Sequence, residues 1–209
     1  MINRQIEVKA EHFTPVHTHV EDAEVNGTPA LRVVKTDKIP VPDENTYAKL
    51  KDLSFHNGCI EIKMLSRLLP DAPAHARGFI GIVFRANDAD SEFESFYVRP
   101  TNGRQCEDPV RKAHGCQYFS YPGYIFSYFR EFGITAFEAP VDVALDEWIT
   151  LKAVIEEDHA AFYLNGAEQP VLVVEHMKHG PDARGSVGIF VDIGTEAFVS
   201  ALQVTCTDS

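Results

Sequence analysis

The residues of this 209-residue chain whose types and spacing could do chemistry are arginines gathered in its middle. Five of the ten arginines fall between residues 85 and 130, among tyrosines, an asparagine and a histidine. Guanidinium groups make bidentate, charge-assisted hydrogen bonds, and tyrosine combines a flat apolar ring with a polar tip. The pattern predicts a binding site for a polar ligand with hydroxyls and some negative charge. The candidate ligand-binding residues are Arg85, Tyr97, Arg99, Asn102, Arg104, Arg111, His114, Tyr118 and Tyr121.

The same arginines could instead form an internal network of salt bridges with Asp108, Glu94 or Glu138. The two interpretations make opposite predictions for Arg99→Ala. Loss of a ligand contact should weaken binding by about 1.5–3 kcal/mol. A carboxylate left buried without its partner should instead cost about 3–5 kcal/mol of folding stability. The sequence leaves both interpretations open.

Few side chains could act as acids or bases in catalysis. Glu92 and Glu94 have the two-residue spacing that puts carboxylates on one face of a strand, and a retaining glycosidase needs its carboxyl groups about 5–5.5 Å apart. They share that face with Phe96, which we expect in the core, so a solvated strand start is the favoured interpretation. The weak catalytic candidates that remain are His114 as an acid or base, with Asp108 or Glu138 as its partner.

Two histidine pairs could begin a metal site, His17 with His19 and His176 with His179. Neither has an obvious carboxylate or thiol to complete the three or four ligands that zinc requires. There is also no phosphate-binding glycine loop and no nucleophile elbow. We therefore predict no metal and no cofactor.

Composition limits the partners. The 31 acidic and 19 basic side chains give a net charge of −12, which argues against non-specific binding to nucleic acid. No apolar run is long enough to span a membrane, and no apolar signal-peptide region is visible. We expect a soluble, cytoplasmic protein, although a chain trimmed of its signal would look the same. The four cysteines should be thiols, but Cys106 and Cys116 could pair if oxidised.

Short apolar or alternating runs recur along the chain, separated by Gly, Pro, Asn and Asp. They predict an all-β protein, an antiparallel two-sheet jelly-roll β-sandwich in which residues 1–209 form a single domain. Hairpin turns are expected at 156–159 and at Asn165-Gly166, and a short helix around 124–132. The predicted strands are 30–35, 59–65, 79–85, 93–99, 115–120, 149–156, 159–164, 171–174, 186–192 and 198–205.

Strand alternation converts this spacing into geometry. In 79–85, Gly81, Val83 and Arg85 share one face, and in 93–99 Tyr97 and Arg99 lie on one face. With the apolar faces in the core, Arg85, Tyr97 and Arg99 should point outward from one sheet. The aromatic segment 118–132 should cover that outer side. The predicted core residues are Ile80, Ile82, Phe84, Phe96, Val98, Leu151, Phe162, Leu164, Val187 and Ile189.

The C-terminal half has a recognisable series of segments, Trp148–Ala153, Ala161–Gly166, Gly185–Phe190 and Phe198–Val204. Together with Gly78–Arg85 and Phe96–Pro100, it resembles the concanavalin A-like lectin/glucanase superfamily, including laminin-G-like and keto-disaccharide hydrolase-like domains. The resemblance implies two curved antiparallel sheets, carbohydrate on the concave face, and a structural calcium ion as an accessory. The E-x-D-x-(x)-E pattern of the glucanases is absent.

The sequence therefore predicts a lectin-like protein that binds a carbohydrate or sugar-acid ligand on an Arg/Tyr-lined concave face. The first alternative is a glycoside-hydrolase-like enzyme acting on a sugar derivative, and the second is a laminin-G-like protein-interaction module. An ordered arginine-lined pocket with a perturbed carboxylate or histidine would favour the enzyme, a shallow aromatic groove the lectin, and a flat apolar face the interaction module.

Overall fold

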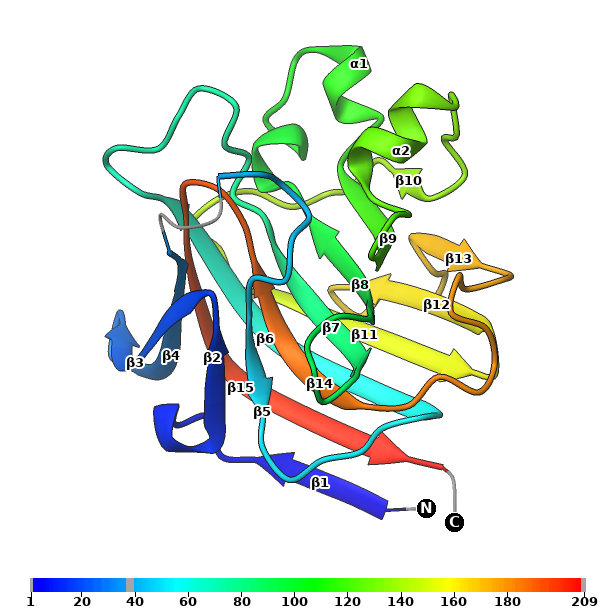
Figure 1. Ribbon diagram of the computed structural model, residues 1–209. Coiled ribbons are helices and arrows are strands. Elements are labelled where there is room, and N and C mark those ends of the chain that lie inside the picture. Colours follow the sequence, from blue (N-terminus) through cyan, green and yellow to red (C-terminus); the bar gives the residue numbers. More distant parts are fainter. Residues whose placement is uncertain (1, 37–39, 208–209) are drawn as a thin grey trace.

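The computed structural model describes residues 2–36 and 40–207. Two antiparallel sheets stack face to face (Figure 1), which confirms the predicted jelly-roll sandwich. The eight-stranded sheet runs β13 (Leu172–Val174), β12 (His159–Leu164), β11 (Ile149–Glu156), β6 (Gly58–Leu68), β15 (Thr195–Cys206), β4 (Thr28–Lys35) and β3 (Thr18–Val25), with β1 (Ile2–Ile6) also on β15. The seven-stranded sheet runs β10 (Glu138–Ala139), β9 (Cys116–Tyr121), β8 (Phe93–Val98), β7 (Ile80–Ala86), β14 (Ser186–Val191), β5 (Tyr47–Leu50) and β2 (Phe13–Val16).

Burial along the strands explains the two layers. β11 alternates buried and exposed residues, as a strand with one face on the core and one in water should. β7 and β8 are buried at every position because their outer face is covered as well. All ten predicted core residues lie in the main apolar cluster between the sheets, so that prediction is confirmed.

All ten predicted strands exist, and 149–156 and 159–164 have the predicted bounds. The sequence analysis missed β1, β2, β3, β5 and β10. The predicted helix around 124–132 is α2 (Phe126–Glu131), whereas α1 (Pro109–Lys112) and the 3-10 turns η1 (Ala10–His12) and η2 (Pro100–Asn102) were not foreseen.

Both predicted turns are present. Glu156 pairs with His159 across the β11–β12 hairpin, and Glu157 has φ +53°. Asn165 and Gly166 have φ +52° and +72°, the left-handed conformation that makes Asn-Gly a strong turn signal.

A bulge in β7 changes the expected geometry of Arg85. Val83 faces outward as predicted, but Arg85 has φ +54° and the pairing with β14 shifts between Ser186 and Gly188. Ala86 therefore packs in the same outer cluster as Val83. The alternation fails at the bulged residue, so Arg85 does not share an outward face with Tyr97 and Arg99, and that prediction is wrong.

The outer face of the seven-stranded sheet carries a second apolar cluster, rich in aromatic rings. Phe129 of α2 is buried in it, with Ile125 and Tyr128 packed against it, so the segment predicted to cover this face does so. Its buried members are Val16, Tyr47, Phe79, Val83, Ala86, Phe93, Tyr97, Phe119, Phe129 and Phe190.

All four cysteines are free thiols. Within residues 2–36 and 40–207, neither helix is long or apolar enough to cross a membrane.

Candidate functional site

A pocket of about 280 Å³ opens beside the outer aromatic cluster of the seven-stranded sheet, at the end of that sheet where β8 ends. Figure 1 shows both helices gathered at that end of the sandwich. The pocket is lined by the end of β8, by η2, α1 and α2, and by four loops. Its polar lining residues are Asp43, His75, Arg77, Tyr97, Arg99, Asn102, Arg111, His114 and Arg130, and its apolar ones are Pro42, Phe79, Val110, Phe126 and Ile193.

Tyr97 and Arg99 form the floor. Tyr97 points outward from β8, stacks on Phe190 at 5.3 Å between ring centroids and is 1% exposed. Arg99 Nη2 donates to the Tyr97 hydroxyl at 2.8 Å and also to Gln117 Oε1. Arg99 Nη1 donates to Glu138 Oε1 at 2.9 Å, and both of these side chains are buried. The Tyr97 hydroxyl, Gln117 Oε1 and the Glu138 carboxylate each accept a hydrogen bond from the Arg99 guanidinium, which offsets the cost of burying them.

Glu138 collects three basic groups at one side of this floor. Besides Arg99, it accepts from Arg130 Nη2 at 3.1 Å. His114 Nδ1 lies 2.9 Å from Glu138 Oε2, an ion-pair distance without hydrogen-bond alignment. His114 and Glu138 are thus brought together as the sequence analysis proposed for an acid or base and its partner. Asp108, the other proposed partner, instead caps α1 by accepting from the amides of Val110 and Arg111.

Asp43 supplies a carboxylate from the opposite loop. It is 1% exposed and accepts a hydrogen bond from the Phe126 amide at 2.7 Å. Burial raises the pKa of Asp43 to about 6, and the charge of Asp192 adds to that rise, while Arg99 opposes it. The loop is anchored because Asp192 Oδ2 accepts from the Asp43 amide at 2.9 Å and Oδ1 from the buried Lys35 ammonium at 2.6 Å.

Asn102 and Arg111 close the site between η2 and α1. Asn102 is 4% exposed and donates through Nδ2 to the His114 carbonyl at 3.0 Å. Arg111 Nε and Nη2 donate to Asn102 Oδ1 at 3.2 and 3.1 Å, and Nη2 also donates to Thr101. Asn102 therefore holds Arg111 in place through a neutral acceptor.

Arg77 is held in a similar way. Its Nη1 donates to the carbonyls of Ala74 and Ala76, both at 2.8 Å. Burial lowers the pKa of Arg77, and the neighbouring charges of Arg111 and Arg99 lower it further. The guanidinium groups of Arg77 and Arg111 therefore repel one another across this side of the pocket.

Phe126 and Val110 form an apolar rim that remains in contact with water. Phe126 is 36% exposed, and Val110 is 69% exposed. The Arg99 and Arg130 guanidinium carbons lie 5.7 and 5.0 Å from the Phe126 ring centroid. An exposed ring beside buried polar groups can stack on a flat, hydroxylated ligand while those groups orient it.

The structure places five of the nine predicted ligand residues in this pocket, and the other four lie elsewhere. Arg85 donates to the carbonyls of His56, Gly180 and Glu157 and to Asn57 Oδ1, and so ties loops together at a different place in the sandwich. Arg104 pairs with Asp142 and Glu147 on the surface. The five residues in the pocket are Tyr97, Arg99, Asn102, Arg111 and His114.

The two remaining tyrosines have structural partners. Tyr118 faces the core between the sheets, where its hydroxyl donates to Glu94 Oε2 at 2.6 Å. Tyr121 stacks on Phe93 and donates to Glu44 Oε2 at 3.0 Å. Neither lines the pocket, because β9 alternation turns Tyr118 inward and the pocket lies beyond the other end of the strand.

Several lining residues were missed by the sequence analysis, chiefly Asp43, His75, Arg77 and Arg130. All of them come from loops or from α2, whose positions strand periodicity does not determine. Strand alternation placed the aromatic segment 118–132 over the outer face of β8, but nothing in the sequence placed the loops that carry Asp43 and Arg77 there.

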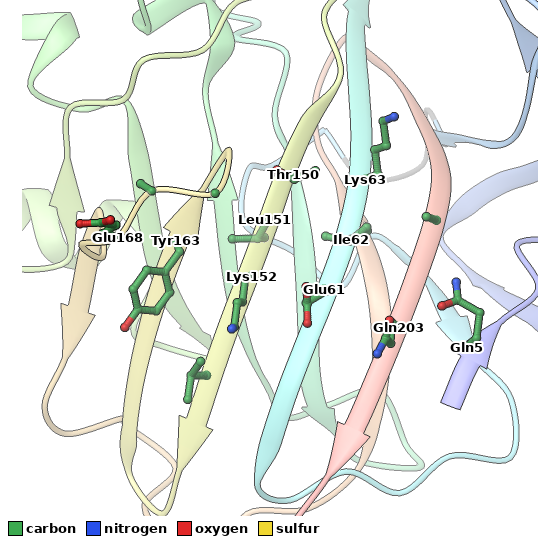
Figure 2. A pocket seen from close by; sticks show the side chains of 14 residues that line it. Gln5, Glu61, Ile62, Lys63, Thr150, Leu151, Lys152, Tyr163, Glu168 and Gln203 are labelled. Atoms are coloured by element: carbon green, nitrogen blue, oxygen red, sulfur yellow. The ribbon is translucent and has the colours of Figure 1, made fainter. Parts of the chain in front are cut away.

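A larger hollow of 670 Å³ lies on the outer face of the eight-stranded sheet (Figure 2). Figure 2 shows Glu61, Lys63, Lys152 and Tyr163 projecting from neighbouring strands. Its charged residues carry both signs and are exposed. A solvated sheet face has this character, so the smaller pocket, with its buried polar groups, is the better candidate site.

No group of three or more His, Cys, Asp or Glu side chains could hold a metal ion in the part of the chain that the structure describes.

No family model matches the sequence, and no curated protein is similar to it at a significant level. Solved structures do share the fold. The carbohydrate-binding module CBM66 from Bacillus subtilis superposes with a TM-score of 0.61 at 13% identity, covering 93% of this chain and 96% of that one. A Bacillus subtilis protein of unknown function with a galectin-like fold gives 0.58 at 12% identity, covering 93% and 89%. At these identities the likeness shows a shared jelly-roll architecture.

Proposed function

We propose that this protein binds a carbohydrate in the pocket at the end of β8. The observation that carries the proposal is the convergence of buried polar side chains, Tyr97, Arg99 and Asp43, on an open pocket with an exposed aromatic rim. Sugars present hydroxyls at their edges and C–H groups on their faces. Donors, an acceptor and a ring at one site match both features. The shared fold with a carbohydrate-binding module supports the proposal.

The pocket volume bears on ligand size. At about 280 Å³ it lies just below the roughly 300–1,000 Å³ typical of small-molecule sites. It therefore suits one sugar unit rather than a long segment of a glycan.

A glycan array followed by calorimetric titration tests the proposal. We expect Asp43→Asn and Phe126→Ala to weaken binding of the selected glycan at least tenfold, because the first weakens an acceptor for sugar hydroxyls and the second removes the rim ring. Arg104→Gln is the matched control, since Arg104 lies outside the pocket on surface ion pairs. Binding that is unchanged in both pocket variants would place the glycan elsewhere and refute the proposal.

A second candidate is an enzyme acting on a sugar derivative, favoured by the arginine-lined pocket in which burial raises the pKa of Asp43, and by the 2.9 Å approach of His114 Nδ1 to Glu138 Oε2. A carboxylate can orient a histidine that moves a proton. In that case His114→Gln should abolish turnover of the bound sugar while a titration still detects binding. A binding protein would show no turnover with either the wild type or the variant.

A further inference from the structure

The pocket has an excess of positive charge on the side formed by Arg77 and Arg111. Four arginines line it, and the carboxylates that meet them are Asp43, in the lining, and Glu138, beside it. Four guanidinium charges against two carboxylates leave two positive charges. This excess stands in a protein whose net charge is −12, so the local sign is opposite to that of the molecule.

The excess positive charge is located at Arg77 and Arg111. Glu138 pairs with both Arg99 and Arg130, and Asp43 interacts with Arg99. Arg77 and Arg111, by contrast, donate to backbone carbonyls, a threonine hydroxyl and an amide oxygen. Among the described residues, no carboxylate lies within ion-pair distance of either one.

Several other arginines of this acidic chain lie beside carboxylates, although Arg85 is bound through carbonyls and an amide oxygen. Arg32 lies 2.6 Å from Glu21 and 2.7 Å from Glu196, and Arg67 lies 2.7 Å from Asp146. Burial lowers the pKa of Arg77, and the nearby charges of Arg111 and Arg99 lower it further, so these guanidinium groups, which are held by neutral acceptors, repel each other. A bound anion would remove that repulsion and would accept charge-assisted hydrogen bonds from both arginines.

We infer that the ligand is an acidic sugar whose anionic group, a carboxylate or a sulfate, binds between Arg77 and Arg111 while its hydroxyls meet Tyr97, Arg99 and Asp43. This inference rests on the proposed function and names the ligand class of the same site. The asymmetry orients the ligand, since the anionic group faces away from the carboxylates of Asp43 and Glu138. Long-range repulsion from the acidic surface makes selectivity depend on these two short-range contacts.

The test measures a selectivity ratio. Calorimetric titration compares each acidic sugar with its neutral partner, glucuronate with glucose and galacturonate with galactose, and galactose 6-sulfate with galactose, after an array of uronate-containing, sulfated and neutral glycans. We expect at least a tenfold preference for an acidic member, or about 1.4 kcal/mol. Arg77→Gln and Arg111→Gln should each lower that ratio about tenfold. Arg77→Lys should lower it less because it keeps the charge, and Arg104→Gln should leave it unchanged. Thermal melts check that each variant is folded.

The outcomes separate the two proposals. A glycan that binds in the pocket with equal affinity for acidic and neutral forms would overturn this inference and leave the proposed function standing. An acidic preference that survives in both glutamine variants would also overturn it. If inorganic sulfate binds as tightly as the acidic sugar, the site recognises a simple anion and the sugar part is wrong. Absence of binding to any glycan would overturn the proposed function and this inference with it.

Discussion

Arg99 is held more firmly than a residue reserved for a ligand needs to be. Its side chain is 5% exposed and that of its partner Glu138 is 3% exposed, and four further residues, Tyr97, Gln117, Arg130 and His114, contact one or the other. The sequence left open whether this arginine is a ligand contact or part of a salt-bridge network. Its geometry makes it part of a network that also forms the floor of a pocket.

The main effect of removing Arg99 should therefore be a loss of folding stability rather than a loss of a ligand contact. We expect Arg99→Ala to lower the free energy of unfolding by about 3–5 kcal/mol, because it leaves Glu138 buried with one fewer cation. Urea denaturation followed by circular dichroism measures the change. Arg104→Ala, which breaks exposed ion pairs, should cost less than about 1 kcal/mol. A wild-type midpoint for Arg99→Ala would show that the ion pair contributes little.

Asp43 should give stability an identifiable pH dependence. Its pKa is about 6 in the folded protein, mainly because of burial, against an ordinary value of 3.8. The folded state thus holds the proton more tightly than the unfolded state. This group's contribution is complete below about pH 3.8 and is lost as the pH rises through about 6. The two pKa values correspond to roughly 3 kcal/mol.

Asp43→Asn isolates this effect because asparagine does not ionise and can still accept from the Phe126 amide. Between pH 4 and pH 7 the free energy of unfolding of the wild type should fall by roughly 2 kcal/mol relative to the variant, because part of the full effect lies below pH 4. Denaturation series at pH 4, 5.5 and 7 measure the difference, and the other titrating groups cancel in the comparison. Parallel curves for the two proteins would mean that Asp43 does not titrate in this range.

At the scale of elements, α2 depends on a single deeply buried ring. Phe129 is 3% exposed in the outer aromatic cluster, whereas Phe132 is 61% exposed. The helix has six residues, too few to be stable without packing. It also carries Phe126 and Arg130 into the pocket. The packing of Phe129 therefore determines both how α2 covers the sheet and where its pocket residues lie.

We expect Phe129→Ala to cost about 3–5 kcal/mol of stability, the scale of a large buried ring, and to abolish glycan binding because α2 loses its anchor. Phe132→Ala removes the same side chain from an exposed position of the same segment and should change stability by less than about 0.5 kcal/mol. Thermal melts and titrations of the two variants form a matched pair. Equal effects would show that burial of Phe129 does not hold the helix.

Elements also show what the sequence could predict. Strands buried on one or both faces have an apolar rhythm, so β11 and β12 were predicted with their bounds and the core residues were all correct. The missed strands β1 and β3 are largely exposed, and β10 has two residues. The polar residues of these strands show no alternation of apolar and polar positions. They are strands because they pair with a neighbouring strand, and their own sequence pattern does not predict this.

The site was half predictable for a related reason. Tyr97 and Arg99 lie on or directly after a strand whose alternation fixes their face, and Asn102, Arg111 and His114 follow closely in sequence. The prediction for Arg85 was wrong because the alternation of apolar residues does not reveal a β-bulge. Asp43 and Arg77 come from loops far from β8 in sequence, and only tertiary contacts such as that of Lys35 with Asp192 place those loops.

For the whole molecule, the sandwich has two outer faces of different character. The eight-stranded sheet presents exposed charges of both signs around its hollow (Figure 2). The seven-stranded sheet presents buried aromatic rings and a positively charged pocket at one end. With a net charge of −12, we expect most of the surface to repel polyanions and an acidic ligand to bind only where arginines gather.

The arrangement of carboxylates in the whole sandwich predicts that this protein is not an endoglucanase. Glu92 is exposed before β8, while Glu94 lies on the inner face, where it accepts from the Tyr118 hydroxyl at 2.6 Å and the His179 amide at 2.9 Å. The outward face of β8 offers Ser95 and Tyr97 in place of a carboxylate pair. Hydrolysis needs a positioned acid and a second carboxylate.

We expect no release of reducing ends from laminarin or lichenan in an assay where a known β-glucanase is active. Turnover that disappears in Glu92→Gln or Glu94→Gln would show that these buried and exposed glutamates do form a catalytic pair.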